Sequence, residues 1–374
     1  MKKLLVAAIF VGLVAGTGAA DNAKPAQVKK EPPRGEKPAA SLNVGDPAPP
    51  LKASKWLQGD EVKAFEPGKV YVVEWWATWC GPCIAFMPDL ADLQARYKDQ
   101  GVTVVGFTAR DLLDVPGNTE EKVAAFVKKR GPKLPYTFAY ADDRATSDAW
   151  MKAAGRMAIP CSFVVDKTGR IAYIGNPMYL GVVLPMVVAG NRKPQEVGDE
   201  VGKIAEEFGA ACDALFPDHK AGLQALKEFE AKYPPLANHF IILRAKLSLL
   251  PKVGEIDEAK KVAEAAVAKA IKQGNSSALM QVAALLRNGP GKESKELLAV
   301  AVKAAEATVQ VAGANNAQAL IELASTYFAI GDKTKAQEYG RKAAEAAAGE
   351  SAELRQYIEQ EAKRIGDGKK QDKK

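Results

Sequence analysis

The spacing of hydrophobic positions along this chain changes near residue 190, and the change predicts two folded regions. Before it, short apolar runs such as residues 70–76 and 102–107, rich in β-branched and aromatic residues, predict buried strands. After it, apolar residues recur at helical spacing among Ala, Lys, Glu and Leu, with hardly any strand signal. The pattern therefore predicts an α/β domain followed by an all-α domain.

The α/β part is predicted to alternate strands and helices. The helix that follows the first strand is expected to be kinked by Pro88. Residues 109–155 form a long stretch between the two halves of this region, with a helix start at 118–121. The other elements expected in chain order are a strand at 70–76, a helix at 80–98, strands at 102–107 and 136–140, a helix at 145–154, a hairpin at 162–165 and 170–174, and a closing helix at 179–189.

Two cysteines lie where the first strand gives way to the helix, in the sequence Trp79-Cys80-Gly81-Pro82-Cys83. A thiol in the first turn of a helix faces unpaired backbone N–H groups and the positive end of the helix dipole, and both favour the thiolate. Two residues between the thiols give about one helical turn, so the second thiol can attack a mixed disulfide formed on the first. We therefore expect Cys80, the more N-terminal and more exposed residue, to be the nucleophile, and Cys83 to be the buried resolving thiol.

A Cys-x-x-Cys pair can also be a structural disulfide or half of a zinc site. Zinc requires four ligands, and the chain has no second such pair and no pair of neighbouring histidines, since His219 and His239 are far from the motif. A haem-attachment motif would need histidine at position 84, which is Ile84. The strand and helix context favours redox chemistry by the cysteines themselves, with no other cofactor and no metal.

Residues 74–83, Glu-Trp-Trp-Ala-Thr-Trp-Cys-Gly-Pro-Cys, together with Pro88 and the Ile159-Pro160 pair, resemble the thioredoxin superfamily, specifically its extracytoplasmic TlpA/ResA-like branch. The resemblance covers about residues 41–189. It implies an α/β thioredoxin fold, with a central mixed sheet flanked by helices and a TlpA-type insertion. It also implies a thiol-disulfide oxidoreductase that acts on protein thiols and disulfides, reduces protein disulfides and is recycled by a membrane thiol-electron donor.

The resemblance further implies which residues contact a substrate. Pro160 matches the cis-proline that the superfamily packs against the active-site disulfide, and the backbone of Ile159 would pair with an extended substrate segment. The Gly81-Pro82 dipeptide resembles that of reducing thioredoxins, and Trp79 is expected at the rim as an apolar platform. The implied substrate-binding residues are therefore Trp79, Gly81, Pro82, Ile159 and Pro160.

Glu74 is the candidate for proton transfer. Thioredoxins place a buried acid at this position, six residues ahead of Cys80. A carboxyl group in a strand of Val and Trp is desolvated, which raises its pKa toward neutrality and suits it to accept a proton from Cys83. The alternative is an exposed strand residue, but alternation puts Glu74 on the same face as Val72 and Trp76.

Three other positions depart from the family pattern or remain open. ResA-like proteins carry glutamate three residues after the second cysteine, where this chain has Phe86. Cys161 is interpreted as a small buried side chain, with a third exchanging thiol near the active site as the alternative. Cys212 has no local partner, and a Cys161–Cys212 bridge is possible but is not established by spacing.

The first residues are typical of an export signal. Two lysines, an apolar stretch and a small-residue end predict a cleaved signal peptide, with an uncleaved membrane anchor as the alternative, and place the protein in the periplasm or cell envelope. The formal charge of +7 is spread over residues of both signs and does not indicate nucleic-acid binding. The predicted segments are a signal peptide at 1–20, a disordered leader at 21–41, a thioredoxin-like domain at 42–190, a linker at 191–198, a helical domain at 199–366 and a basic tail at 367–374.

The helical domain contains an internal repeat. Residues 320–332, followed by Ala336, Tyr339 and Ala343, resemble a tetratricopeptide repeat, and weaker copies precede it. An unrelated helical bundle is the alternative. The resemblance supports a second functional hypothesis, a redox-linked adaptor whose helical repeat domain binds a protein partner.

A peroxiredoxin-like peroxidase is a third hypothesis, and the sequence disfavours it. The Pro-x-x-x-Thr-x-x-Cys arrangement of such enzymes is absent, because Thr78 precedes Cys80 by two residues and the position of the proline is occupied by Val73.

Overall fold

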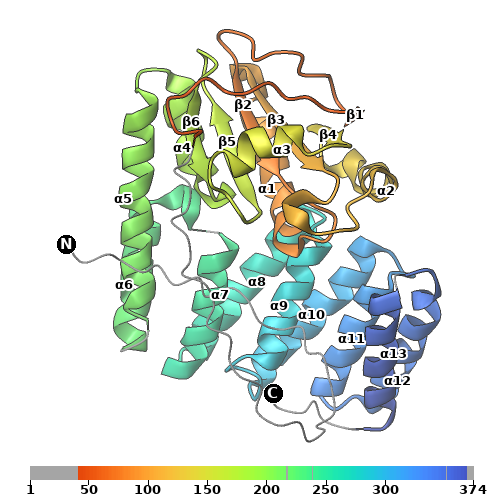
Figure 1. The fold of residues 1–374 in the computed structure, drawn as a ribbon. Helices are drawn as coiled ribbons and strands as arrows, with labels where there is room; N and C mark the ends of the chain where they lie inside the picture. Colours follow the sequence, from red (N-terminus) through yellow and green to blue (C-terminus); the bar gives the residue numbers. More distant parts are fainter. Residues whose placement is uncertain (1–40, 216–217, 238, 351, 369–374) are drawn as a thin grey trace, which may run out of the picture. The chain divides into compact units, whose positions relative to one another are not determined.

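The computed structural model describes residues 41–215, 218–237, 239–350 and 352–368 (Figure 1). The predicted signal peptide, the predicted leader up to residue 40 and the last six residues of the tail therefore lie outside the described part. Within that part, no helix combines the length and the apolar character needed to cross a membrane.

A six-stranded mixed sheet is the centre of the described α/β region, residues 41–190 (Figure 1). Its strand order is β1-β4-β3-β2-β5-β6. Strands β2, β3 and β4 run parallel to one another, and β1, β5 and β6 are antiparallel to their neighbours. The strands are β1 Lys55–Gln58, β2 Val70–Trp75, β3 Val102–Ala109, β4 Thr137–Ala141, β5 Cys161–Val165 and β6 Ile171–Gly175.

Three helices cover one face of the sheet. They are α1 (Gly81–Tyr97), α2 (Glu120–Arg130) and α4 (Leu180–Ala189), which share an apolar cluster with Val72 and Trp76. Because side chains alternate along a strand, every second residue of β2 points into this cluster.

The opposite face of β2 packs on a shorter helical segment. The helix α3 (Ala145–Ser147) runs into a π-helical turn, Asp148–Lys152, and Trp150 of that turn shares a second apolar cluster with Val73 and Trp75. With both faces covered, every residue of β2 is buried, as expected for a continuous apolar strand inside a mixed sheet.

The predicted elements of this region are confirmed, with ends within two residues of the predicted ones. There are two differences. The segment at 145–154 is not one α-helix but α3 followed by the π-helical turn, and the sequence pattern missed β1, an edge strand that is partly exposed.

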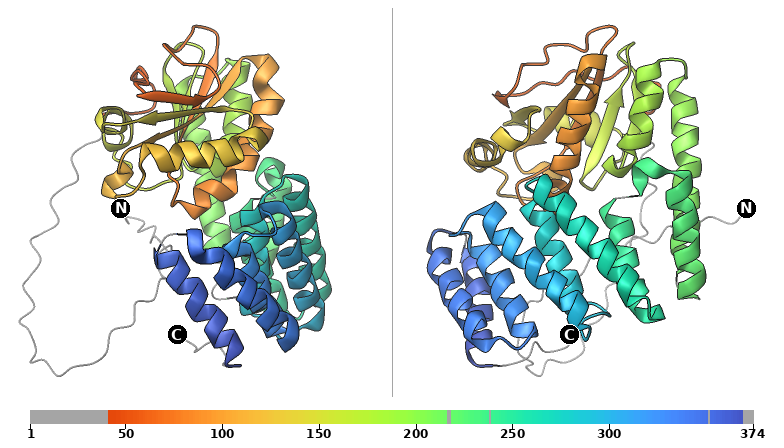
Figure 2. Two further views of the ribbon diagram at one scale, coloured as in Figure 1. Left: turned by 90° about the vertical axis from the view of Figure 1, so that its right-hand side faces the viewer. Right: turned by 180° about the vertical axis from the view of Figure 1, so that it is seen from behind.

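From residue 194 onward, the described residues form helices and no strand. Figure 2 shows several of these helices side by side, and α9 packs on α10 and α11 on α12. The longer helices are α5 Pro194–Asp213, α6 His219–Lys232, α7 Phe240–Leu249, α8 Ile256–Lys272, α9 Ser276–Asn288, α10 Lys295–Ala312, α11 Ala317–Ala329, α12 Lys333–Ala346 and α13 Ala352–Gly366.

Small side chains form the contact between α11 and α12. Ala324 of α11 and Ala336 and Ala343 of α12 are fully buried, and Leu323 and Tyr327 pack in the same cluster. Small residues allow two helices to approach closely, and all of these residues lie in the part of the chain that resembles a tetratricopeptide repeat.

The predicted linker at 191–198 is wrong in its second half, because α5 begins at Pro194. Proline is favoured in the first turn of a helix, and the N–H of Lys193 donates to Oε2 of Glu196 at 2.9 Å, which caps the helix start. Val197 and Val201 of α5 then pack in the same cluster as α1 and α4. The two regions are therefore joined by a packed helix and not by a free linker.

Gly222→Ala is expected to destabilise the helical region. A Cβ at Gly222, in α6, would lie 2.5 Å from the Cα of Leu215, so α6 would have to move, at a cost of about 1–3 kcal/mol. Gly202→Ala is the matched control, because Gly202 in α5 has open space around it and alanine there favours the helix by up to about 1 kcal/mol. Urea unfolding followed by circular dichroism measures both variants, and equal stabilities would contradict the packing of α6 on Leu215.

Candidate active site

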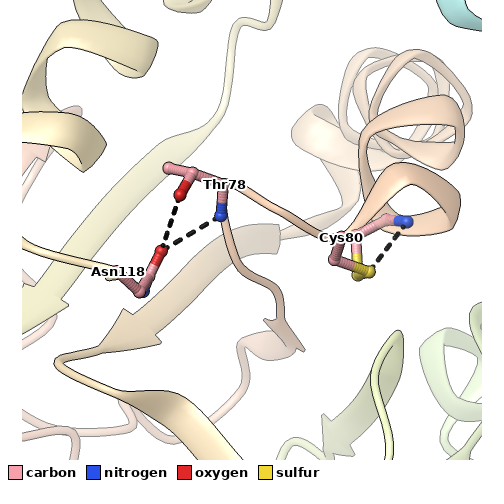
Figure 3. The surroundings of a disulfide bond; sticks show 4 residues. Thr78, Cys80 and Asn118 are labelled. Atoms are coloured by element: carbon pink, nitrogen blue, oxygen red, sulfur yellow. Dashed lines mark hydrogen bonds between the residues drawn. A yellow bond between two sulfur atoms is a disulfide. The ribbon is translucent and has the colours of Figure 1, made fainter. Parts of the chain in front are cut away.

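The two cysteines of the motif form a disulfide at the start of α1, with Sγ atoms 2.00 Å and Cα atoms 5.3 Å apart (Figure 3). Cys80 is the N-cap residue of α1, and its Sγ accepts a hydrogen bond from the N–H of Cys83 at 3.2 Å. The N–H of Cys80 donates to the carbonyl oxygen of Ala77 at 3.0 Å and closes the turn between β2 and α1. The first sulfur thus lies where the sequence predicts it, against the free N–H groups of a helix start.

The prediction that Cys80 is exposed is wrong for the disulfide form. Cys80 is 4% exposed, barely more than Cys83 at 2%. Both residues belong to the apolar cluster under α1, and the bond to Cys83 holds the Cys80 sulfur against that cluster. The neighbouring residues Trp79, Gly81 and Pro82 are exposed, so the predicted substrate-contacting residues of the motif do form the surface here.

The turn before Cys80 is held from the inserted segment ahead of α2. Oδ1 of Asn118 accepts hydrogen bonds from the N–H of Thr78 at 3.0 Å and from its hydroxyl at 3.1 Å. The Asn118 amide nitrogen donates to the hydroxyl of Thr108 and to the carbonyl oxygen of Ala109, both at 2.8 Å. In Figure 3, Thr78 is directed at Asn118 and away from the sulfur of Cys80, so its hydroxyl gives the peroxidase hypothesis no support.

Glu74 is a buried acid in the middle of the sheet, as predicted. It is 2% exposed and lies between Gly106 of β3 and Ser162 of β5. Burial raises its pKa from 4.5 to about 8, although the hydrogen bond that the Ser162 hydroxyl donates to Oε2 acts in the opposite direction. Its Oε1 has no hydrogen-bond partner among the described residues. Alternation along β2 puts Glu74 on the face of Val72 and Trp76, which is the face that the cysteines pack on.

The segment before β5 borders the active-site turn. The Ile159–Pro160 peptide bond is cis, as the family resemblance implies. Cys161, the next residue, pairs with Trp75, the last residue of β2 before the turn. Ile159 is half-buried and packs against the cluster that contains both cysteines of the motif. The structure therefore places Ile159 beside the cluster that holds both cysteines, and substrate contact by Ile159 and Pro160 stays a prediction.

The two remaining cysteines are free thiols and do not form the bridge that the sequence left open. Cys161 is buried, and burial, with a smaller contribution from the nearby Glu74 carboxyl, raises the pKa of its thiol to about 12. Such a thiol is almost entirely protonated at neutral pH and reacts slowly, in agreement with a small packing side chain. Cys212 is partly buried, and burial raises the pKa of its thiol as well.

Phe86 occupies the position at which ResA-like proteins are expected to carry a second glutamate. It is half-buried, and its ring lies 5.7 Å from the imidazole of His239, measured between centroids. Burial lowers the pKa of His239 to about 4, so the imidazole is uncharged at neutral pH. An apolar contact thus replaces a charged group on this side of α1.

Side chains of α8 and of the loop before α9 also bond to α1. Asn275 donates from its side-chain nitrogen to the carbonyl oxygen of Ala85 at 2.9 Å. Lys269 pairs with Asp89 at 2.9 Å, and Gln273 donates to the same carboxylate at 3.1 Å. The helix that carries the cysteines is therefore in contact with the helical region.

Comparison with known proteins shows to which family the chain is related. The family model described as Redoxin matches residues 43–178. Protein FixW of Rhizobium leguminosarum is 37% identical over 153 residues, which are 41% of this chain and 69% of FixW. Thiol-disulfide oxidoreductase ResA of Bacillus cereus is 30% identical over 131 residues, which are 35% of this chain and 68% of ResA. The chain belongs to the TlpA/ResA-like branch of the thioredoxin superfamily. At the level of the family its chemistry is thiol–disulfide exchange.

One solved structure similar to this thioredoxin-like chain is the solution structure of a thioredoxin-like protein in the oxidised form. It is 20% identical, covers 40% of this chain and 100% of its own, and has a TM-score of 0.33.

Two polar residues of the thioredoxin-like site were missed from the sequence. Ser162 follows a cysteine in an apolar strand, and its contact with Glu74 depends on the pairing of β2 with β5. Asn118 was interpreted only as part of a helix start, but the N-cap of α2 is Thr119, whose hydroxyl accepts from the N–H of Lys122. No feature of the sequence singles out Asn118, because its burial and its hydrogen bonds to the end of β3 are known only from the fold.

Glu74→Gln is expected to remove a pH dependence of stability. The folded protein keeps the Glu74 proton up to about pH 8, whereas the unfolded chain loses it near 4.5. The stabilising contribution is therefore complete below the lower pKa and is lost as the pH rises through the upper one. Relative to Glu74→Gln, the wild-type free energy of unfolding should fall by up to about 4 kcal/mol between about pH 5 and about pH 8, at about 1.4 kcal/mol per unit.

Denaturation followed by tryptophan fluorescence makes this measurement specific, because all five tryptophans of the chain lie between residues 56 and 150. Glu61→Gln, at an exposed position, is the control and should follow the wild type at every pH. A constant difference between wild type and Glu74→Gln across this pH range would show that the Glu74 carboxyl is ionised to the same extent in the folded and unfolded states, so that its pKa is not raised by folding.

Proposed function

We propose that this chain is an exported thiol–disulfide oxidoreductase that reduces protein disulfides, with Cys80 as nucleophile and Cys83 as resolving thiol. The observation that carries the proposal is the Cys80–Cys83 disulfide at the N-terminus of α1, packed on the same face of the sheet as the buried acid Glu74. A redox-active disulfide of this kind needs no other cofactor, because the two sulfurs store the two electrons that are exchanged.

The hydrogen bond from Cys83 supports Cys80 as the attacking residue. The N–H that donates to the Cys80 sulfur in the disulfide is in place to stabilise the thiolate once the disulfide is reduced. The positive end of the α1 dipole acts in the same direction. Cys83 lies one turn inside the helix, within bonding distance of the Cys80 sulfur, so it is the residue that attacks second.

The reaction begins from the dithiol. The Cys80 thiolate attacks one sulfur of a substrate disulfide, a Cys80–substrate disulfide forms, and the other substrate sulfur leaves as a thiolate. Cys83 then loses its proton and attacks the Cys80 sulfur, which releases the second substrate thiolate and restores the Cys80–Cys83 disulfide. The two substrate sulfurs gain two electrons and take up two protons. The two cysteines of the enzyme lose two electrons and two protons.

Glu74 supports the second step by accepting the proton of Cys83 in those molecules in which its carboxyl is ionised, a fraction that grows as the pH rises toward its pKa of about 8. A carboxyl group with a pKa of about 8 is close to the pKa of a thiol, so proton transfer between them requires little energy at neutral to mildly alkaline pH. The buried position keeps the proton within the site and away from the apolar surface that receives the substrate.

The exposed residues beside the disulfide fit a protein substrate. Trp79 is exposed beside Cys80 and offers an apolar surface, and Gly81 and Pro82 add none of the bulk that would keep an extended chain away. The backbone of Ile159, next to Pro160, supports pairing with an extended segment.

The oxidised enzyme must be recycled by a dithiol donor. The donor is oxidised to a disulfide, and the Cys80–Cys83 disulfide gains two electrons and two protons. The family resemblance and the N-terminal residues 1–20 support an extracytoplasmic place of action, and the resemblance implies a membrane protein as the thiol-electron donor. The helical domain remains available to a protein partner, but no contact of the described residues favours the adaptor hypothesis over the enzyme.

Cys80→Ser is expected to abolish the reduction of insulin disulfides, measured with dithiothreitol as electron donor. Without the attacking sulfur the rate should fall to that of dithiothreitol alone, whereas Cys212→Ser, which removes a thiol far from the motif in the sequence, should keep the wild-type rate. Wild-type activity in Cys80→Ser would refute the proposed mechanism.

Cys83→Ser is expected to form a stable covalent complex with a disulfide substrate. The first step is intact in this variant, but no second thiolate is available to release the substrate. Non-reducing electrophoresis and mass spectrometry should show the complex with Cys83→Ser and not with the Cys80→Ser, Cys83→Ser double variant. A complex that forms through Cys161 or Cys212 would instead show that Cys80 is not the nucleophile.

A further inference from the structure

We propose that Asn118 is a positioning residue for Cys80, and that it acts by holding the active-site turn through Thr78. The inference deepens the proposed function, because it names a residue outside the Cys-x-x-Cys motif on which the reactivity of Cys80 depends.

The side chain of Asn118 is fully buried and all four of its hydrogen-bonding positions are used. The orientation of the amide follows from chemistry: the N–H of Thr78 can only donate and the carbonyl of Ala109 can only accept. Asn118 therefore ties the active-site turn to the end of β3. An alanine at this position would leave a buried N–H and a buried carbonyl without partners.

These hydrogen bonds are not needed to start α2. Thr119 is the N-cap residue of that helix and accepts from the N–H of Lys122. The N–H of Cys80 is bonded to Ala77 within the turn, whereas the N–H of Thr78 has its partner in the inserted segment. The insertion thus supplies a contact that the turn does not make within itself.

The position of the Cys80 sulfur is restrained from both sides in the disulfide form. On one side are the turn and its bond to Asn118, and on the other are α1 and the bond to Cys83. When the disulfide is reduced, the covalent restraint is lost and the turn becomes the main restraint on the sulfur. A thiolate must approach a disulfide in line with the sulfur–sulfur bond, and a displacement of about 1 Å in such a reaction can cost about a hundredfold in rate.

The same restraint acts on the equilibrium between dithiol and disulfide. A loosened turn brings Cys80 and Cys83 together less often, so their disulfide forms less readily. Loss of the Asn118 contact should therefore slow attack by Cys80 and also make the Cys80–Cys83 disulfide easier to reduce. A residue with only a structural role would lower the stability of the fold and leave both quantities unchanged.

Gln94 provides a matched control. It is a second buried amide that ties a helix to β3, since its side-chain nitrogen donates to the carbonyl oxygen of Val102 at 2.9 Å and its Oε1 accepts from the N–H of Val104 at 2.7 Å. Gln94 lies in the second half of α1 and bonds to the start of β3, so it has no contact with the turn. Gln94→Ala removes two side-chain hydrogen bonds at the start of β3, and Asn118→Ala removes four, two of them at the end of the same strand.

The test uses the full-length protein and glutathione. The rate of reaction of the reduced protein with oxidised glutathione should fall by at least about tenfold in Asn118→Ala and stay within about twofold of wild type in Gln94→Ala. The equilibrium constant for oxidation of the dithiol by oxidised glutathione should fall by at least about threefold in Asn118→Ala and be unchanged in Gln94→Ala. Thermal unfolding is expected to show a loss of stability in both variants.

Equal effects of Asn118→Ala and Gln94→Ala on rate and equilibrium, or no effect of Asn118→Ala on either, would overturn the proposal. Thr78→Val keeps the backbone bond to Asn118 and loses only the hydroxyl bond, so it should slow the reaction by about twofold to fivefold. If Asn118→Ala does not fold, the reaction rate of Thr78→Val with oxidised glutathione becomes the test. A wild-type rate in Thr78→Val would then overturn the proposal. Failure of the proposed function would show separately, as wild-type protein that does not reduce insulin.

Discussion

The first turn of α1 has backbone N–H groups without partners inside the helix, and Cys80 places its sulfur against them. In the proposed mechanism this contact makes Cys80 the reactive member of the pair, because it favours the thiolate of Cys80 and not that of Cys83. The contact between the Cys80 sulfur and these N–H groups exists only if the helix begins directly after Cys80. The bond from the N–H of Cys80 to Ala77 and the tie from Thr78 to Asn118 meet that requirement, one within the turn and one from the inserted segment.

Glu74 shows how burial near that turn changes the protonation of a carboxyl group. A carboxyl group in the middle of a six-stranded sheet is fully desolvated, and the single hydrogen bond from Ser162 offsets this only in part. The group is therefore kept neutral at physiological pH, where it does not disrupt the core. The same low polarity raises the pKa of the Cys161 thiol, so that this third thiol close to the site stays protonated at neutral pH.

The sequence predicted the parts of this site that depend on residues close together in the chain. The Cys-x-x-Cys spacing, the strand before it and the alternation that turns Glu74 inward are all properties of neighbouring residues. Ser162 and Asn118 could not be placed, because their partners lie 88 and 40 residues away in the chain and depend on strand pairing and on the path of the insertion. The exposure of Cys80 was wrong for a related reason: its burial follows from packing in the cluster under α1, which its place in the motif does not reveal.

The boundary between the two regions was misplaced because composition and packing change at different residues. The shift to Ala, Lys and Glu near residue 190 marks where strands stop, but α5 still contributes Val197 and Val201 to the cluster under α1 and α4. Further along the same helix, Ile204 packs with Phe229 and Ile242 in a separate cluster of the helical region. A single helix therefore serves two cores, so removal of everything after residue 190 would expose apolar surface of the α/β region. The bonds from Asn275 and Lys269 to α1 add to this dependence, and they make the helical region part of the environment of the helix that carries the cysteines.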